Sequence, residues 1–88
     1  MNKYSYEYYK KDKLTGDVLD YNEATIKEKS FNNVFDCVMI KHFLKDEMAK
    51  SNCYYHVNVT MMETYDNIDF PYEQKSKIYI NGMESFIF

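Results

Sequence analysis

Apolar residues recur at helical spacing in one long stretch of the chain, from Ser30 to Ser51. This is the only segment that is long and periodic enough to form a helix of five or six turns. Ser30 is suited to the N-cap position, because its hydroxyl can accept a hydrogen bond from a free N–H group of the first turn. The first half of the predicted helix carries one apolar stripe, made of Phe31, Val34, Phe35 and Val38.

The apolar stripe changes sides halfway along this helix. At about 100° per residue, Ile40, Phe43 and Leu44 lie nearer to the polar face of the first half than to its apolar stripe. An amphipathic helix that lies straight across one sheet keeps a single stripe. One interpretation is a helix covered on several sides, or one with a bulge that rotates its second half. The other is a second surface, formed by Ile40, Phe43 and Glu47, that buries against another chain.

Two strands are predicted before the helix. From Tyr4 to Lys10 the side chains alternate between two faces. A polar run with Gly16, which can adopt a positive φ, then predicts a fairly long hairpin loop. The second strand, from Val18 to Lys29, alternates more weakly, and a bulge near Tyr21 to Ala24 would reconcile its apolar positions. One face of the first strand carries three tyrosines, namely Tyr4, Tyr6 and Tyr8.

Three further strands are predicted after the helix. Residues from Cys53 to Tyr65 alternate clearly, and we expect this strand to be central in the sheet. Near the end of the chain, Asn81 and Gly82 stand between two alternating runs, which is typical of a tight type I′ hairpin turn. This turn predicts that Lys75 to Ile80 pairs with Met83 to Phe88.

The stretch from Glu63 to Glu73 is predicted to be a loop, because it is strongly acidic and contains Pro71, which disrupts a strand ladder. Its four acidic residues are Glu63, Asp66, Asp69 and Glu73. They are interleaved with four apolar residues, namely Tyr65, Ile68, Phe70 and Tyr72. Aromatic side chains beside carboxylates favour an interface with a basic partner. The alternative is a polar connection whose aromatic side chains tuck under the edge of the sheet.

These elements predict an α+β fold in which a single helix packs on an antiparallel sheet, in the order ββαβββ. The 88 residues make one compact domain, 1–88. Ten tyrosines and six phenylalanines supply the large side chains that a small core needs. No run approaches the roughly 20 apolar residues of a membrane span, and no signal peptide is recognisable, so we expect a cytoplasmic, soluble protein with free thiols.

The charge pattern argues against sequence-specific DNA recognition. All eleven basic residues are lysine, and the formal net charge is −3. Base readout relies on the guanidinium fork of arginine, which this chain lacks. The lysine-rich, tyrosine-rich and asparagine-rich composition is typical of an AT-rich genome, such as those of many Firmicutes and their phages.

No catalytic, metal or phosphate-binding signature is evident. Cys37, His42, Cys53 and His56 are close in sequence, but their spacing on a helix and on a strand turns the members of each pair away from each other, which disfavours a zinc site. Nothing orients a histidine toward a cysteine nucleophile. The acidic stretch lacks the glycine and the final glutamate of a calcium loop. We therefore expect no enzyme activity, metal or cofactor.

The sequence thus predicts a small non-enzymatic protein-interaction module. Its size and composition suggest an inhibitor of a larger host factor that a phage or another mobile element encodes, of the anti-restriction or anti-CRISPR type. The alternative is a single-stranded nucleic-acid binder that uses the tyrosine strand and three hairpin lysines; an unrecognised enzyme ranks third. A homodimer is left open. The expected partner-binding residues are Ile40, Phe43, Glu47, Glu63, Asp66, Asp69, Phe70, Tyr72 and Glu73. The hairpin lysines are Lys10, Lys11 and Lys13.

Overall fold

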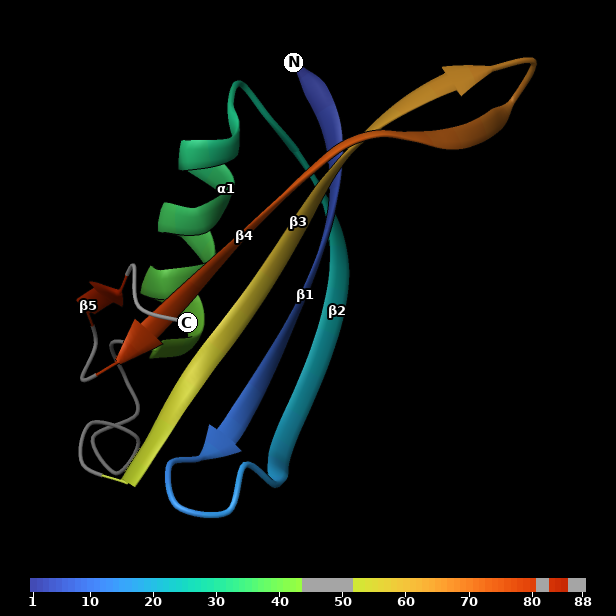
Figure 1. Ribbon diagram of the computed structural model, residues 1–88. Coiled ribbons are helices and arrows are strands. Elements are labelled where there is room, and N and C mark those ends of the chain that lie inside the picture. The colour runs from blue at the N-terminus through green and yellow to red at the C-terminus, as the bar shows by residue number, and fades with distance from the viewer. Residues whose placement is uncertain (44–51, 81–82, 86–88) are drawn as a thin grey trace.

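The computed structural model describes residues 1–43, 52–80 and 83–85 of the chain. Its elements follow the order ββαβββ, as predicted (Figure 1). The elements are β1 (Asn2–Asp12), β2 (Val18–Glu28), α1 (Phe31–Val38), the π-helical segment η1 (Met39–Phe43), β3 (Cys53–Tyr65), β4 (Ile68–Ile80) and β5 (Met83–Ser85).

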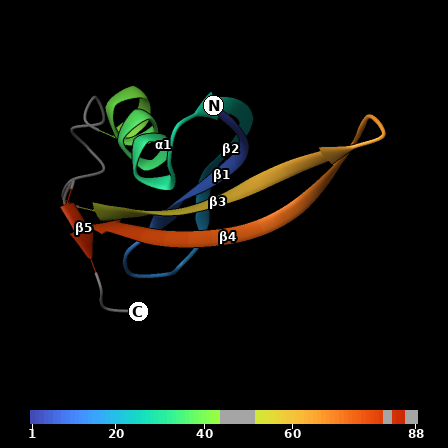
Figure 2. The same ribbon diagram turned by 90° about the horizontal axis from the view of Figure 1, so that it is seen from above.

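The strands form one antiparallel sheet in the order β2-β1-β3-β4-β5. The third strand is therefore central, as its alternation predicts. The helix α1 packs on one face of the sheet, and Figure 2 shows it on that side. The predicted α+β architecture is confirmed. The opposite face, called the open face below, is not covered by any helix of the described part of the chain.

The start of the helix follows the predicted pattern. Ser30 has an extended backbone, with φ −155° and ψ 163°, and its Oγ accepts a hydrogen bond from the Asn33 amide at 3.2 Å. The four residues of the first apolar stripe are all buried against the sheet. Within the described ranges, no helix has the length and apolar character that crossing a membrane requires.

The helix continues as a π-helical segment, η1, and this explains the change of stripe. A π-bulge inserts one extra residue into a helix, so that the following side chains rotate relative to those before. Phe43 is thereby brought back to the sheet, where it is 2% exposed, whereas Ile40 is 60% exposed. The bulge interpretation is confirmed. The expectation that Phe43 belongs to an outer binding surface is wrong, because its ring is part of the core.

Aromatic rings fill most of the space between helix and sheet. The ring of Phe43 stacks on that of Tyr55 with 4.0 Å between centroids, and Tyr8 meets Phe43 edge-on at 5.5 Å. The buried residues are Tyr4, Tyr6, Tyr8, Phe31, Val34, Phe35, Val38, Phe43, Cys53, Tyr55, Val57, Val59 and Tyr79. The tyrosine face of the first strand is therefore core, and it is not available for stacking on bases.

The β1–β2 hairpin has the predicted loop. Gly16 adopts φ +75°, and the Asp12 carboxylate accepts hydrogen bonds from the amides of Leu14 and Thr15. The bulge lies elsewhere than predicted. Lys10 pairs with Asp20 but Lys11 pairs with Val18, so the extra residue is Leu19 and not one of residues 21–24. Leaving Leu19 without a partner lets the adjacent Val18 pair with Lys11, so the ladder continues up to the loop.

The acidic stretch of residues 63–73 is not a loop. It belongs to β3 and β4, which pair along their whole length around a two-residue turn. The loop prediction is wrong because Pro71 lies beside a register shift, on the part of β4 that β5 does not pair, where a missing N–H is tolerated.

The C-terminal hairpin is described only in part. Residues 83–85 pair with residues 78–80, which agrees with the predicted strand pairing. The predicted turn at Asn81 and Gly82 lies outside the described residues. So do residues 86–88 of the last strand, and residues 44–51 of the predicted helix together with Glu47.

Candidate protein-interaction surface

The end of the β3–β4 hairpin projects from the rest of the molecule, and residues 63–73 are called the arm below. Figures 1 and 2 show it extending past the helix and past the other strands, in line with overall dimensions of 45 × 21 × 21 Å. The turn at its tip is formed by Asp66 and Asn67, with φ values of 51° and 65°. Two positive φ values in a two-residue loop define a type I′ turn, and aspartate and asparagine tolerate this conformation better than other residues with a side chain.

A β-bulge marks the base of the arm. Met61 pairs with Glu73, but Met62 pairs with Pro71, so Tyr72 is an additional residue in β4. A bulge bends its strand and increases the local twist. The bulge therefore allows the arm to leave the direction of the main sheet.

Three apolar side chains of the arm lie on the same sheet face as the core, namely Tyr65, Ile68 and Phe70. Val59 is buried on that face, and alternation along β3 brings Tyr65 to the same side. Tyr65 pairs with Ile68 in the hairpin, and its ring centroid lies 6.2 Å from that of Phe70. The apolar face of the sheet thus continues onto the arm.

The helix α1 does not cover this part of the sheet. Phe31, at its first turn, packs on Tyr4 at 5.1 Å, and Tyr4 pairs with Met61, two residues before the arm starts. The apolar side chains beyond this point are well exposed: Tyr65 60%, Ile68 57%, Phe70 48% and Tyr72 65%. Neighbouring apolar side chains that remain exposed among carboxylates are typical of a protein-interaction surface.

The carboxylates of the arm differ in what they contact. Asp69 accepts from the Lys3 ammonium at 2.5 Å and from the Thr64 hydroxyl at 2.6 Å, and these two contacts lower the pKa of Asp69. Glu63 accepts a hydrogen bond from the Tyr65 hydroxyl, which raises the pKa of that tyrosine. Asp69 therefore ties the arm to β1.

The structure brings most of the predicted partner-binding residues together on the arm. They are Glu63, Asp66, Asp69, Phe70, Tyr72 and Glu73. Ile40 is exposed but lies on η1, next to Phe43, which contacts Tyr55 at the opposite end of β3 from the arm. The prediction omitted Tyr65 and Ile68 from the partner-binding set. Their positions on either side of Asp66 and Asn67, two residues that favour a tight turn, could have identified them as part of an exposed hairpin tip.

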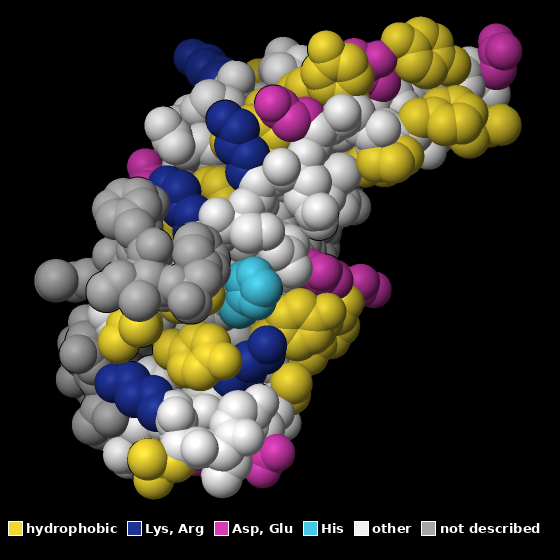
Figure 3. All heavy atoms as spheres, viewed as in Figure 1, with side chains coloured by type: hydrophobic (Ala, Val, Ile, Leu, Met, Phe, Trp, Pro, Cys, Tyr) yellow, Lys and Arg dark blue, Asp and Glu magenta, His cyan; other side chains and the backbone are white. Residues whose placement is uncertain are grey.

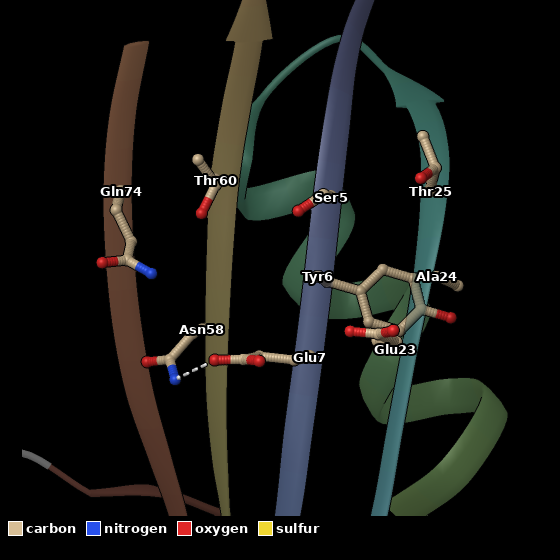
Figure 4. Close-up of a pocket in the computed structure, with 9 residues that line it drawn as sticks. All are labelled: Ser5, Tyr6, Glu7, Glu23, Ala24, Thr25, Asn58, Thr60 and Gln74. Atoms are coloured by element: carbon tan, nitrogen blue, oxygen red, sulfur yellow. Dashed lines mark hydrogen bonds between the residues drawn. The ribbon is translucent and has the colours of Figure 1, made fainter. Parts of the chain in front are cut away.

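A second surface, on the open face, carries a polar hydrogen-bonded strip across four strands. Glu7 pairs with Glu23 on β2 and with Asn58 on β3, and Asn58 pairs with Ser76 on β4. The Asn58 amide donates to Glu7 at 3.1 Å (Figure 4). The Ser76 hydroxyl in turn donates to Asn58. On this face, the polar side chains therefore satisfy one another's hydrogen-bonding groups.

The two glutamates share a hydroxyl donor. The Tyr21 hydroxyl lies 2.8 Å from the Glu23 carboxylate and 3.2 Å from that of Glu7. These hydrogen bonds strongly raise the pKa of Tyr21, since ionisation would place a third negative charge between the carboxylates. Like charges directly opposite each other destabilise a strand pair. The shared donor reduces that cost.

This strip borders a hollow of about 490 Å³ in the open face. Its lining residues, drawn in Figure 4, are Ser5, Tyr6, Glu7, Glu23, Ala24, Thr25, Asn58, Thr60 and Gln74. Figure 3 views the molecule from this side, with polar side chains in the middle and hydrophobic and acidic ones on the arm. The hollow is a place where polar groups of a ligand could be bound.

The cysteines and histidines are distributed over both faces of the sheet. His42 packs against Tyr8 on the core face at 4.8 Å, and His56 packs against Tyr9 on the open face at 6.4 Å. Burial and the Lys11 charge lower the pKa of His56. Cys37 and Cys53 are free thiols, as predicted.

Comparison with protein-family models, with curated proteins and with solved structures finds no match for this chain.

Proposed function

We propose that this protein is a non-enzymatic interaction module that binds a protein partner through its arm. The observation that supports the proposal most directly is the group of four apolar side chains, 48–65% exposed, on a hairpin that projects from the core. Burying them on a partner would remove apolar area from water at about 25 cal/mol per Å². The core of the domain does not need them, because α1 packs elsewhere on the sheet.

The charge of the arm indicates the kind of partner surface. Residues 63–73 contain four carboxylates and no basic residue. Asp69 forms an ion pair with Lys3 of β1. We therefore expect the other three carboxylates, those of Glu63, Asp66 and Glu73, to meet the partner. The partner surface that fits is therefore basic at its rim, with an apolar hollow for the aromatic rings.

Binding through side chains fits the arm better than extension of the sheet. An outer strand that invites pairing is long, flat and uncharged. On β4, Lys75 and Lys77 point toward the helix face and lie over the rings of Phe31 and Phe35, at 4.9 Å and 4.7 Å. Pro71 and the bulge interrupt the strand further on. Inward-pointing lysines, a proline and a bulge are the features that protect a sheet edge from another strand.

The narrower sequence-based prediction, an inhibitor that a mobile element encodes, depends on size and composition and stays a prediction. The single-stranded nucleic-acid alternative depended on Tyr4, Tyr6 and Tyr8 as a stacking surface. Their side chains are 2–5% exposed. Rings that are buried to this extent cannot stack on bases, which disfavours that alternative.

Capture of partners from a lysate with and without nuclease, followed by binding measurements with the purified partner, tests the proposal. We expect a partner that persists after nuclease treatment. The double variant Phe70→Ser and Tyr72→Ser should lose at least about 30-fold in affinity, because aromatic anchors often contribute about 2 kcal/mol or more each.

The matched control is Val18→Ser with Leu19→Ser, two apolar residues that are each 54% exposed in the other hairpin. It should bind like the wild type. Both variants should keep the melting temperature within a few degrees, which circular dichroism will show. Recovery of nucleic acid alone, or equal binding by the arm variant and the wild type, would contradict the proposal.

A further inference from the structure

The hollow in the open face continues toward the arm. A second hollow, of about 300 Å³, is lined by Thr60, Pro71, Tyr72, Glu73 and Gln74. It shares Thr60 and Gln74 with the larger hollow. The two together form one groove, called the groove below, which starts between β2 and β1 and reaches the bulge at the base of the arm.

The dimensions of the groove suit an extended peptide segment. Four adjacent strands, about 4.8 Å apart, span roughly 14 Å from the first to the last. An extended chain advances about 3.3 Å per residue, so about four residues cross the groove. The groove crosses the strands instead of following an edge, so its occupant contacts side chains on the face of the sheet.

One end of the groove is acidic. Glu7 and Glu23 lie on neighbouring strands, and Figure 4 shows the Glu7 carboxylate beside Asn58 and Glu23 on the other side of β1. Each carboxylate has about four acceptor positions. Glu7 accepts from Tyr21 and Asn58, and Glu23 accepts from Tyr21. A cationic side chain fits this end, because it supplies donors and offsets the repulsion between the two carboxylates.

Two lysines of the open face have ammonium groups that contact residues other than Glu7 and Glu23. Lys3 pairs with Lys27 on β2, one row beyond Ser5 and Thr25, and its ammonium is held by Asp69. The Lys11 ammonium lies over the ring of Tyr9 at 5.6 Å. The middle of the groove is neutral, with hydroxyl and amide groups that can donate to or accept from a peptide backbone. These groups are contributed by Ser5, Thr25, Asn58, Thr60 and Gln74.

The other end offers an apolar contact. Tyr72 is 65% exposed there, beside Pro71. A second copy of this chain placed with its two-fold axis at the acidic end would bring its own Glu7 and Glu23 against those of the first, which is unfavourable. The required occupant is instead basic at one end and apolar at the other.

We infer that the groove binds an extended segment of the partner protein, with a lysine or arginine beside Glu7 and Glu23 and an apolar residue against Tyr72. This inference rests on the proposed function, since it assigns the groove to the same partner as the arm. It adds a contact with a different chemistry, because the groove shares Tyr72 with the arm but also offers carboxylates, hydroxyls and amides.

The test uses a blocked six-residue peptide of sequence Lys-Thr-Lys-Thr-Leu-Thr and the same peptide with both lysines acetylated. Their titration into ¹⁵N-labelled protein is followed by the amide shifts of the groove residues. We expect saturable shifts at groove positions with the first peptide, weakening as salt rises, and none with the acetylated one. The double variant Glu7→Gln and Glu23→Gln should bind at least tenfold more weakly. Its glutamines can still accept from Tyr21, so the sheet should stay intact.

The control variant, Asp17→Asn with Glu28→Gln, changes the net charge equally outside the groove and should bind normally. The inference is overturned by shifts outside the groove alone, by equal binding of the acetylated peptide, by normal binding in the glutamate variant, or by self-association that fills the groove. Failure of the proposed function is distinguishable. Phe70→Ser removes an arm contact outside the groove, so peptide binding should survive in this variant even where partner binding by the arm is disproved.

Discussion

Truncation of Phe43 to alanine should be among the most destabilising single changes in this domain. The side chain is 2% exposed, stacks on Tyr55 at 4.0 Å, and contacts Tyr8 and Tyr79 at 5.5 Å and 5.4 Å. Deleting a large buried aromatic side chain costs about 3–5 kcal/mol, through lost burial and the cavity left behind. A chain of 88 residues has a total stability of roughly 4–13 kcal/mol. The variant should therefore lose a large part of its stability.

Chemical denaturation monitored by circular dichroism measures this loss of free energy of unfolding. In a thermal melt, a cost of about 3 kcal/mol corresponds to a fall in melting temperature of roughly 12–24 °C for a domain of this size. The matched control is Ile40→Ala, three residues earlier on η1, where the side chain is 60% exposed. It should change stability by no more than about 0.5 kcal/mol.

The comparison of the two variants tests the π-helical segment itself. In a regular helix, Ile40 and Phe43 would lie on the same side, away from the first apolar stripe. Similar costs for both changes, or a loss of under about 1 kcal/mol for Phe43→Ala, would refute the argument that the bulge returns Phe43 to the core.

Three further predictions concern the hairpins. Asn67→Val should destabilise the domain by about 1–2 kcal/mol, because a β-branched residue is strained at φ 65°. Asn67→Gly should be neutral or stabilising. Equal denaturation midpoints for the two variants would contradict the positive φ at this position. The pKa of Asp69 is lowered by Lys3, so its contribution to stability is present above about pH 4 and is lost as the pH falls through the lowered value; melts from pH 7 to pH 2 should show this loss in the wild type but not in Asp69→Asn. The pKa of Tyr21 is raised by Glu23 and Glu7, so its contribution is present below about pH 10 and is lost as the pH rises above that value; Tyr21→Phe should abolish that alkaline component, and an unchanged alkaline profile would contradict the shared hydrogen bonds.

The sequence predicted those parts of the fold whose signal lies in consecutive residues. Ser30 and the stripe that follows it identify α1, because capping and helical spacing are local properties. The alternation of β1 and β3 identifies their buried faces for the same reason. The neighbour relationship between β1 and β3 has no such signal. It depends on how the helix returns the chain to the sheet, which is a property of the whole fold.

The arm shows why a segment can be mistaken for a loop. Its acidic composition and Pro71 both disfavour a strand. The competing signal was a type I′ turn at Asp66 and Asn67 with alternating residues on either side, which is weaker than an Asn-Gly pair because neither residue is glycine. The place of the bulge at Leu19 was equally hard to predict, since several positions near the loop would restore the same alternation. The sequence therefore pointed to six residues of the candidate surface, but not to Tyr65 and Ile68 and not to the hairpin shape of the arm.

The arm has a physical cost that bears on its role. Fixing the backbone of one residue costs roughly 1–2 kcal/mol, and a two-stranded hairpin by itself is marginally stable in water. With its apolar side chains 48–65% exposed, the arm gains little from burial. What holds it in place is its continuity with β3 and β4 and the ion pair between Lys3 of β1 and Asp69, two residues beyond the turn of the arm. That ion pair joins β1 to the far strand of the hairpin and so limits the directions in which the arm can point. Since a pre-oriented arm loses less freedom when it binds, the contact between Lys3 and Asp69 serves the proposed partner surface by positioning it, although neither residue needs to touch the partner.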